Sequence, residues 1–450
     1  MNKNGKIVIL GGGPTGLGAA WKLNELGYKN WKIFESSDNV GGHSSSHKDL
    51  KGFTWDEGGH IFFSNIKYFN NIFERVFLGK YYIKKRYQSI LFSGKFIPYP
   101  FQNHIRYLPK NVILECLYGL VDIIGEKKNI KNFFEFIKFT MGDGISKHFM
   151  IPYNSKVWSW PLDKMNAEWI AERVSLVDIK KLINHIVTQK DDVLWGPNAF
   201  FKYPKMGGSG AFWKEFLDIF PKKIFFQKNA IRLNIKKKLI YFSDNSQESY
   251  DFLISTLPLD NLIFSSNSSS KIKALSKKLK HNSGFLVGLG INGKQPKILD
   301  KKIALYFPDY KWSFHRATIL RNFSTSMTPP NTWSILFEAS FSKNRKLTIN
   351  KVESDAKRFL KDFDLIKSEK DIMNVWKKRV PYFYPIPTIG LQDVLYKIQK
   401  YLLKHDIFSR GRFGNWRYEI GNMDHSFMLG VDAVNHIEIE KEKTFKIYED

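Results

Sequence analysis

The sequence has almost no cysteine and no long apolar run, and each absence excludes a class of protein. Cys116 is the only cysteine among 450 residues, so neither an internal disulfide nor a thiolate zinc cluster holds the fold together. We expect Cys116 to be a small buried apolar residue rather than a nucleophile. The apolar stretch 113–125 is interrupted by Glu115 and Asp122, and no segment approaches the roughly 20 apolar residues of a membrane span.

The N-terminus and the charge balance bear on location and partners. The apolar residues 7–10 are followed at once by three glycines, which makes the run too short for a signal peptide. We therefore expect a cytoplasmic protein. The net charge is +27, but the lysines are spread along the whole chain, which indicates solvated faces rather than a nucleic-acid site. This field would still attract an anionic substrate.

The first 35 residues carry the pattern of a dinucleotide site. Residues 6–10 predict a short buried strand, 17–26 a helix and 31–34 a second strand. The intervening turn reads G-x-G-x-x-G, which lets a pyrophosphate approach the helix N-terminus. Glu35 follows the second strand. Its distance from the glycine turn is the one expected for a carboxylate that binds a ribose hydroxyl. The residues of this predicted site are Gly11, Gly13, Gly16 and Glu35.

Further glycines favour FAD over NAD. Gly41-Gly42 follows the second strand, Gly58-Gly59 precedes His60, and a third glycine-rich stretch spans 207–210. Paired glycines let the backbone pass close to a long cofactor, and an NAD domain needs neither of the first two pairs. With 43% hydrophobic residues, the chain can bury the cores of the two or three domains that its length predicts.

The chain as a whole resembles the UDP-galactopyranose mutases, in particular their eukaryotic-type branch. The resemblance rests on segments that run in the family's order and cover nearly the whole chain. They are GGGPTGLGAAWKLNELG (11–27), GFTWDEGGHIFFSNIKYF (52–69), IPYPFQN (97–103), PYNSKVWSWPLDKM (152–165), ERV (172–174), WGPNA (195–199), LYFP (305–308), FHRATI (314–319) and SRGRFGNWRYEIGNMDHSFMLGV (409–431).

The resemblance implies an α/β fold, in which an FAD-binding Rossmann-like domain carries an inserted helical domain and a mainly antiparallel sheet domain. The expected boundaries are 1–102, 198–265 and 405–450 for the discontinuous FAD-binding domain, 103–197 for the helical domain and 266–404 for the sheet-rich substrate domain. Residue patterns agree, with helical spacing at 132–139 and 179–186 and strand patterns at 252–256, 285–291, 302–307 and 334–341.

The resemblance also implies the reaction. The family interconverts the pyranose and furanose forms of a nucleotide-linked sugar without net redox change. We therefore expect a flavin-dependent isomerase that converts UDP-galactopyranose to UDP-galactofuranose for cell-surface glycans, with N5 of the reduced flavin attacking the anomeric carbon. NADPH or NADH would supply the electrons once rather than in every turnover. UDP-N-acetylgalactosamine, a 6-deoxy sugar nucleotide and UDP-arabinose stay open as substrates, an FAD-dependent oxidase is the less favoured alternative, and the oligomeric state is open.

The family's motifs carry over onto named residues, and no metal is expected. Arg173 and Arg316 match a diphosphate clamp, since a guanidinium pairs two N–H groups with phosphate oxygens, and Asn198 matches a residue of a mobile flap. The expected catalytic residues are Arg173, Arg316, His60 and Arg412. The expected substrate-binding residues are Arg86, Tyr99, Gln102, Asn154, Trp158, Arg173, Asn198, Tyr306, Arg316, Tyr384 and Tyr418. The expected cofactor-binding residues are Gly11, Gly13, Thr15, Gly16, Glu35, Gly41, Gly42, Gly59, His60, Arg412, Gly421, Asn422 and Ser426.

The chain departs from the family's pattern at two positions that we expect to lie near the site. Asn65 stands where the eukaryotic-type branch usually has histidine, and Ala304 stands where it usually has tryptophan. The chain also lacks a long insertion after Phe323. These differences leave the reaction class unchanged and the identity of the sugar open.

Overall fold

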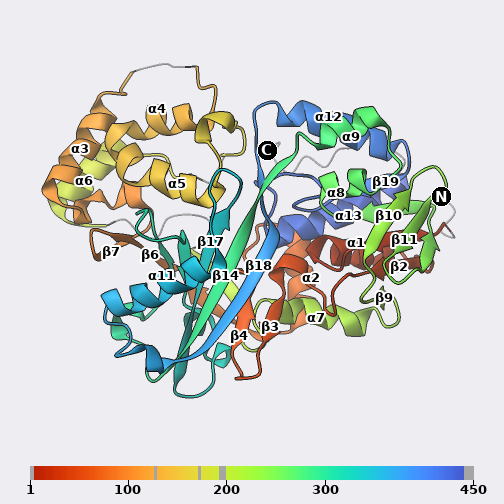
Figure 1. The fold of residues 1–450 in the computed structure, drawn as a ribbon, viewed down its shortest axis with the longest axis horizontal. Helices are drawn as coiled ribbons and strands as arrows, with labels where there is room; N and C mark the ends of the chain where they lie inside the picture. Colours follow the sequence, from red (N-terminus) through yellow and green to blue (C-terminus); the bar gives the residue numbers. More distant parts are fainter. Residues whose placement is uncertain (1–4, 126–128, 171–173, 192–198, 440–450) are drawn as a thin grey trace.

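The computed structural model describes residues 5–125, 129–170, 174–191 and 199–439. Segments that are far apart in the sequence build an α/β region around a parallel sheet, a group of helices and a large, mainly antiparallel sheet between them (Figure 1). The predicted fold class is confirmed. Within the described residues, no helix combines the length and the apolar character needed to cross a membrane.

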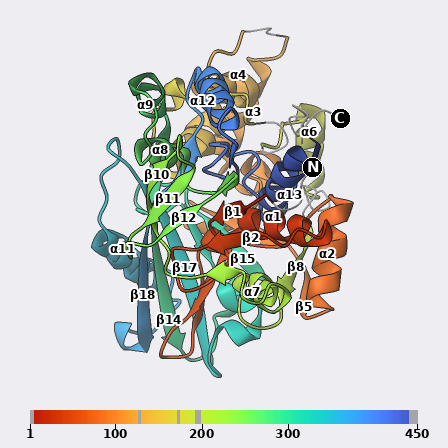
Figure 2. The same ribbon diagram turned by 90° about the vertical axis from the view of Figure 1, so that its right-hand side faces the viewer.

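The α/β region is built on a five-stranded parallel sheet in the order β19-β13-β1-β2-β9. Its strands are β1 (Ile7–Leu10), β2 (Trp31–Phe34), β9 (Ile224–Phe225), β13 (Phe252–Ser255) and β19 (Ile407–Ser409). The short apolar runs predict these central strands well, because both faces of a parallel sheet are covered. A three-stranded antiparallel sheet of β10 (Ala230–Asn234), β11 (Leu239–Phe242) and β12 (Gln247–Ser249) lies beside it (Figure 2).

Two helices from opposite ends of the chain cross closely on one face of this sheet. They are α1 (Pro14–Glu25) and α13 (Met423–Ile439). A Cβ on Gly18 would lie 2.1 Å from the Phe427 carbonyl oxygen, and one on Gly430 would lie 1.9 Å from the Thr15 carbonyl oxygen. Glycine at both positions therefore lets the backbones touch.

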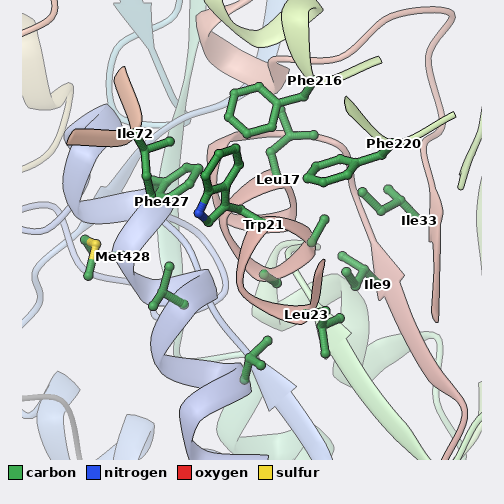
Figure 3. Packing of buried hydrophobic residues seen from close by; sticks show 14 of the residues in the cluster. Ile9, Leu17, Trp21, Leu23, Ile33, Ile72, Phe216, Phe220, Phe427 and Met428 are labelled. Carbon is green, nitrogen blue, oxygen red and sulfur yellow. The ribbon is translucent and has the colours of Figure 1, made fainter. Parts of the chain in front are cut away.

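Apolar side chains from four helices fill the space around this crossing (Figure 3). Trp21 of α1 meets Phe216 of α7 (Gly210–Ile219) edge to face, with ring centres 5.9 Å apart. Phe427 of α13 and Ile72 of α2 (Lys67–Phe77) complete the cluster. The core thus ties both ends of the chain to its middle.

The large sheet has seven strands in the order β18-β14-β17-β16-β15-β6-β7, and β15 and β6 run parallel. The strands are β6 (Tyr87–Phe92), β7 (Lys95–Pro98), β14 (Lys280–Asn292), β15 (Lys302–Tyr306), β16 (Arg316–Thr318), β17 (Thr332–Phe341) and β18 (Ile372–Ile386). The helix α11 (Ile349–Asp362) covers one face through Val352 and Phe359. The strands expected at 285–291, 302–307 and 334–341 correspond to β14, β15 and β17.

Two segments lie elsewhere than the expected domain boundaries suggest, so the division into domains stays a proposal. The hairpin 87–98, expected in the FAD-binding part, extends the large sheet because β6 pairs with the open edge of β15. The helix α12 (Leu391–Leu403), expected in the sheet domain, packs its apolar face into the core of the α/β region. The places of the hairpin and of α12 depend on contacts between residues that are far apart in the sequence.

The helical region contains α3 (Lys110–Val121), α4 (Phe133–Ile145), α5 (Ile151–Trp158) and α6 (Ile179–Thr188). The side chain of Asn132 caps α4 by accepting from the Glu135 N–H at 2.8 Å. Helices α3 and α4 meet at glycines, and a Cβ on Gly144 would lie 2.4 Å from the Cys116 nitrogen. Cys116 is fully buried there, as expected, and burial raises the pKa of its thiol to about 12.

The remaining elements connect these regions. They are β3 (Ser46–Lys48) with β4 (Thr54–Asp56), β5 (Tyr81–Lys85) with β8 (Phe200–Pro204), and the helices α8 (Leu259–Phe264), α9 (Ser270–Ser276) and α10 (Leu320–Phe323).

Candidate active site

One continuous cavity of about 1490 Å³ runs from the β1–α1 turn to the junction of the helical region and the large sheet. Residues of all three regions line it. Single-ligand pockets typically measure roughly 300–1,000 Å³, so this cavity has room for a long cofactor and a second ligand.

The first end of the cavity fits a dinucleotide. Gly13 and Gly42 face each other there, and a Cβ on Gly13 would lie 3.7 Å from the Gly42 Cα. No side chain caps the N-terminus of α1, so the N–H groups of its first turn are available to a phosphate. Glu35 is held at the rim, where its Oε2 accepts from the Gly12 N–H at 2.6 Å and its Oε1 from the Ser37 N–H at 2.8 Å. Bare backbone, helix terminus and carboxylate are the parts that the adenosine half of FAD requires.

Most of the expected cofactor-binding residues line this cavity, and two do not. Gly16 instead allows close packing, because its Cβ would lie 1.9 Å from the Gly11 carbonyl oxygen. Gly41 has φ +108°, so it serves the turn that leads to Gly42. The residues that line the cavity as expected are Gly11, Gly13, Thr15, Glu35, Gly42, Gly59, His60, Arg412, Gly421, Asn422 and Ser426.

The middle of the cavity is bounded by His60, Arg412 and the start of α13. His60 Nε2 lies 3.2 Å from the Glu57 carbonyl oxygen, which can only accept, so Nε2 carries the proton and Nδ1 is the acceptor. Burial, together with Arg316 and Arg412, lowers the pKa of His60 to about 4, which keeps the ring neutral at neutral pH. Arg412 lies over the rings of Tyr384 and Tyr418, at 5.3 and 5.6 Å from their centres.

Arg316 is held in a fork by a buried carboxylate. Its Nε and Nη2 donate to Glu338 at 2.7 and 2.6 Å, and the Glu338 side chain is only 1% exposed. Burial alone would lower the pKa of Arg316, but the Glu338 charge outweighs it and raises this pKa above its usual range. A guanidinium has five N–H groups. Glu338 engages two of them, and Arg316 lines the cavity with the others available to a ligand.

The far end of the cavity is an aromatic subsite. Tyr99 stacks on Tyr306 with ring centres 4.9 Å apart, and Gln88 donates to the Tyr306 hydroxyl at 2.6 Å. Gln102 is buried and donates to the Ser175 carbonyl, while its Oε1 has no partner among the described residues. Trp158 is buried against Tyr418, with ring centres 4.8 Å apart. This end combines a stacking platform with an amide acceptor that is buried without a partner.

Of the expected substrate-binding residues, nine line the one cavity: Arg86, Tyr99, Gln102, Asn154, Trp158, Tyr306, Arg316, Tyr384 and Tyr418. The other two, Arg173 and Asn198, lie outside the described residues. The two departures from the family pattern, Asn65 and Ala304, also face this cavity.

The structure adds residues that the sequence patterns did not single out. Glu338 is the only charged residue of β17, an otherwise apolar strand, and that exception was the available signal. Glu57 accepts from Lys378 of β18 and from His47 at 2.7 Å. Burial alone would raise the pKa of Glu57, but these hydrogen bonds and the Lys378 charge outweigh it and lower this pKa to about 2. Lys378 is one of two consecutive lysines on β18, so nothing in its local sequence indicated this contact.

Comparison with known proteins shows to which family the chain belongs. Residues 9–77 match the family model of an NAD(P)-binding Rossmann-like domain. A crystal structure of reduced UDP-galactopyranose mutase is 39% identical in sequence and superposes with a TM-score of 0.94, covering 97% of this chain and 94% of the other. The chain belongs to the UDP-galactopyranose mutase family. It is therefore an enzyme of the flavin-dependent isomerase class, and the expected family is confirmed. Its place in the eukaryotic-type branch stays a prediction.

More distant structures share the fold alone. A putative protoporphyrinogen oxidase from an Exiguobacterium species is 15% identical with a TM-score of 0.74, and covers 97% of this chain and 99% of its own. A fatty acid isomerase from P. acnes that produces CLA is also 15% identical, with a TM-score of 0.67 and coverage of 98% and 100%. The match to the mutase, together with the Rossmann-type domain, implies FAD as the cofactor.

Proposed function

We propose that this mutase-family enzyme converts UDP-galactopyranose to UDP-galactofuranose with FAD in its reduced form, and that NADPH or NADH reduces the flavin. One observation carries the proposal above all. A single cavity joins a dinucleotide cradle to the Arg316–Glu338 pair and to an aromatic subsite. An amine or porphyrinogen oxidase has no need of a fixed guanidinium for a leaving diphosphate.

Arg316 binds the diphosphate in this proposal. Two of its N–H groups are held by Glu338, so the plane of the guanidinium is fixed and the remaining N–H groups keep one direction. Charge-assisted hydrogen bonds of this kind are short and strong. A fixed cation stabilises the negative charge on the nucleotide as it leaves the sugar, at no reorganisation cost.

The bound reduced flavin would supply the nucleophile that the side chains lack, while the chain positions groups and excludes water. His60 stays neutral and presents Nδ1 as an acceptor for a hydrogen-bond donor on the cofactor. The N-terminus of α13 contributes positive potential at the same place, which favours an anionic ring. Arg412 adds a full positive charge between Tyr384 and Tyr418.

The aromatic subsite holds the uridine. Tyr99 and Tyr306 offer stacked faces to the base, and the Gln102 carbonyl oxygen accepts from the uracil N–H. Asn154 and Trp158 border the same space. Arg173 completes the diphosphate clamp and Asn198 belongs to a flap over the sugar, each on the strength of its match to the family's motifs. Arg86 contacts the nucleotide, since it lines the same cavity.

Ala304 leaves more room in the cavity than the tryptophan usual in the eukaryotic-type branch. This room favours UDP-N-acetylgalactosamine as the alternative substrate, and a 6-deoxy sugar nucleotide and UDP-arabinose stay open as well.

The test is incubation of the dithionite-reduced, FAD-loaded protein with each nucleotide sugar, followed by chromatography for the furanose product. We expect conversion of UDP-galactopyranose by the reduced protein and none by the oxidised protein. An Arg316→Ala variant that still holds FAD serves as the negative control for the site. Consumption of oxygen in step with loss of an amine or porphyrinogen, without any furanose product, would establish the oxidase alternative instead.

A further inference from the structure

His315 is a polar residue in the cavity wall to which the proposed function gives no role. It is 2% exposed, it lines the cavity, and its Nδ1 has no hydrogen-bond partner among the described residues. The ring lies among Tyr153, Phe383 and Tyr384, with centres 6.4, 6.3 and 6.5 Å away. A buried donor without an acceptor is costly in a protein interior, so the enclosed Nδ1 bears on which ring nitrogen carries the proton.

His315 lies in the bend just before β16 and lines the cavity together with the first residue of that strand. Phe314, Ala317 and Ile319 point into the core between the sheet and α11, whereas His315 and Arg316, although consecutive, both line the cavity. The backbone is held in this form because the His315 N–H donates to the Glu338 carbonyl at 2.9 Å and its carbonyl accepts from Phe307 at 3.0 Å. The imidazole and the guanidinium therefore face the same space.

The neighbourhood of His315 is cationic and rigid. Lys156 is fully buried and donates to the carbonyls of Phe307 and Asp309 at 2.7 and 2.8 Å, and Arg345 donates to the Ser313 carbonyl at 2.6 Å. Burial, with Arg316, Lys156 and Arg345 nearby, lowers the pKa of His315 well below its usual value. The ring is neutral at neutral pH, so one nitrogen carries a proton and the other does not.

The protonated nitrogen can be assigned from burial. A proton on Nδ1 would be a buried donor without an acceptor, at a cost of roughly 1–3 kcal/mol. The proton therefore resides on Nε2, which is the nitrogen that is not enclosed. His315 thus presents an N–H donor to the cavity, next to the Arg316 guanidinium.

We infer that His315 is a substrate-binding residue whose Nε2–H donates to a diphosphate oxygen of the nucleotide sugar, beside Arg316. The inference rests on the proposed function, since it needs a nucleoside diphosphate in this cavity. Its location supports this choice, because Tyr153 meets Tyr306 of the uridine subsite while Tyr384 meets Arg412. His315 lies between these two groups, where a diphosphate joins base and sugar.

The binding test uses the FAD-loaded protein with UDP and with uridine as probes, measured by calorimetry. His315→Phe keeps a planar ring without a donor, and we expect UDP to bind about tenfold more weakly while uridine binds as in the wild type. His315→Gln restores an N–H near the Nε2 position and should recover most of the UDP affinity. The control is His281→Phe, because His281 stacks on Tyr382 outside this cavity and should leave both affinities unchanged.

Other outcomes have distinct meanings. Unchanged UDP affinity in His315→Phe overturns the inference, and so does an equal loss for UDP and uridine, which would indicate a packing or base contact. A wild-type protein that does not bind UDP overturns the proposed function itself. If the wild-type protein binds UDP but converts no sugar, the proposed reaction is wrong. The variants then still decide whether His315 contacts the diphosphate.

A second measurement does not depend on the folding of a variant. In wild-type protein labelled with ¹⁵N-histidine, His315 should show the neutral Nε2–H tautomer, and UDP should shift its Nε2 resonance while uridine does not. The His315→Gln sample assigns the signal by its loss. An Nδ1–H tautomer, or an Nε2 resonance that UDP does not shift, overturns the inference.

Discussion

Substitutions in the Arg316–Glu338 pair should affect both the stability of the fold and the affinity for UDP, and the two effects can be measured separately. Removing one member of a buried ion pair typically costs roughly 3–5 kcal/mol, because the other charge is left buried and uncompensated. The Arg316 side chain keeps 25% of its surface toward the cavity, so we expect Arg316→Ala to destabilise the protein by about 3 kcal/mol, near the lower end of that range. The double variant Arg316→Ala/Glu338→Gln should regain at least half of this loss, because no stranded charge remains.

The affinity for UDP depends on a second property of Arg316, its contact with the diphosphate. Hydrogen bonds to charged groups are worth roughly 1.5–3 kcal/mol each, so losing even one N–H contact to the diphosphate should weaken UDP binding at least about tenfold. The single variant should bind UDP more weakly than the double variant, since its Glu338 carboxylate then faces the diphosphate without a partner. Both variants should bind uridine normally. Calorimetry measures the affinities, and thermal unfolding of the FAD-loaded proteins measures the stabilities.

The control is Arg232→Ala, which removes a surface arginine that stacks on Tyr241. A single variant that matches the wild type in both stability and UDP affinity would refute the reasoning.

Three further predictions concern the cofactor and the scaffold. Conversion of UDP-galactopyranose should require reduced flavin, with NADPH consumed once per enzyme molecule and not per turnover; equal rates for oxidised and reduced protein in the chromatographic assay would contradict this. Gly13→Ala should lower the FAD content, because the new Cβ would enter the cofactor site opposite Gly42. The FAD content is measured as flavin absorbance per protein. The control is Gly94→Asn, since Gly94 lies in open space with φ +77°. Asp56 is fully buried, and burial outweighs its hydrogen bonds and raises its pKa to about 6. Its contribution to stability is present below the unfolded pKa of about 3.9 and is lost as the pH rises through 6. The cost of Asp56→Asn in thermal unfolding should therefore shrink by about 2 kcal/mol between pH 4.5 and 7, and parallel profiles for the two proteins would argue against it.

The local part of the fold could be predicted from the sequence. The strand over Trp31–Phe34 has the predicted bounds, and the glycine turn before α1 has the expected neighbours. Both depend on short apolar runs and on backbone freedom, which neighbouring residues determine. The assignment of 87–98 to the large sheet could not be predicted in this way, because it depends on pairing with β15 more than 200 residues later.

The site shows the same division. Residues inside long motifs, such as Tyr99 and Arg412, could be placed near a common cavity from the family resemblance alone. Glu338 and His315 required the structure. The partner of Glu338 lies on a neighbouring strand, and His315 lies in the bend just before β16, where strand alternation does not apply. Periodicity predicts which face a residue occupies, but not where that periodicity fails.

The order of strands in the parallel sheet has a consequence for biosynthesis. The strand β1 lies between β13 and β2, and β13 pairs in turn with β19 at residues 407–409. A ribosome that adds about 5–20 residues per second exposes β1 for some 20–80 s before the β19 segment is made. During this time α1 also lacks α13, against which Gly18 packs. Shortening the chain at its C-terminal end should therefore leave an apolar N-terminal half that aggregates, and separate expression of the α/β region as one contiguous piece should fail.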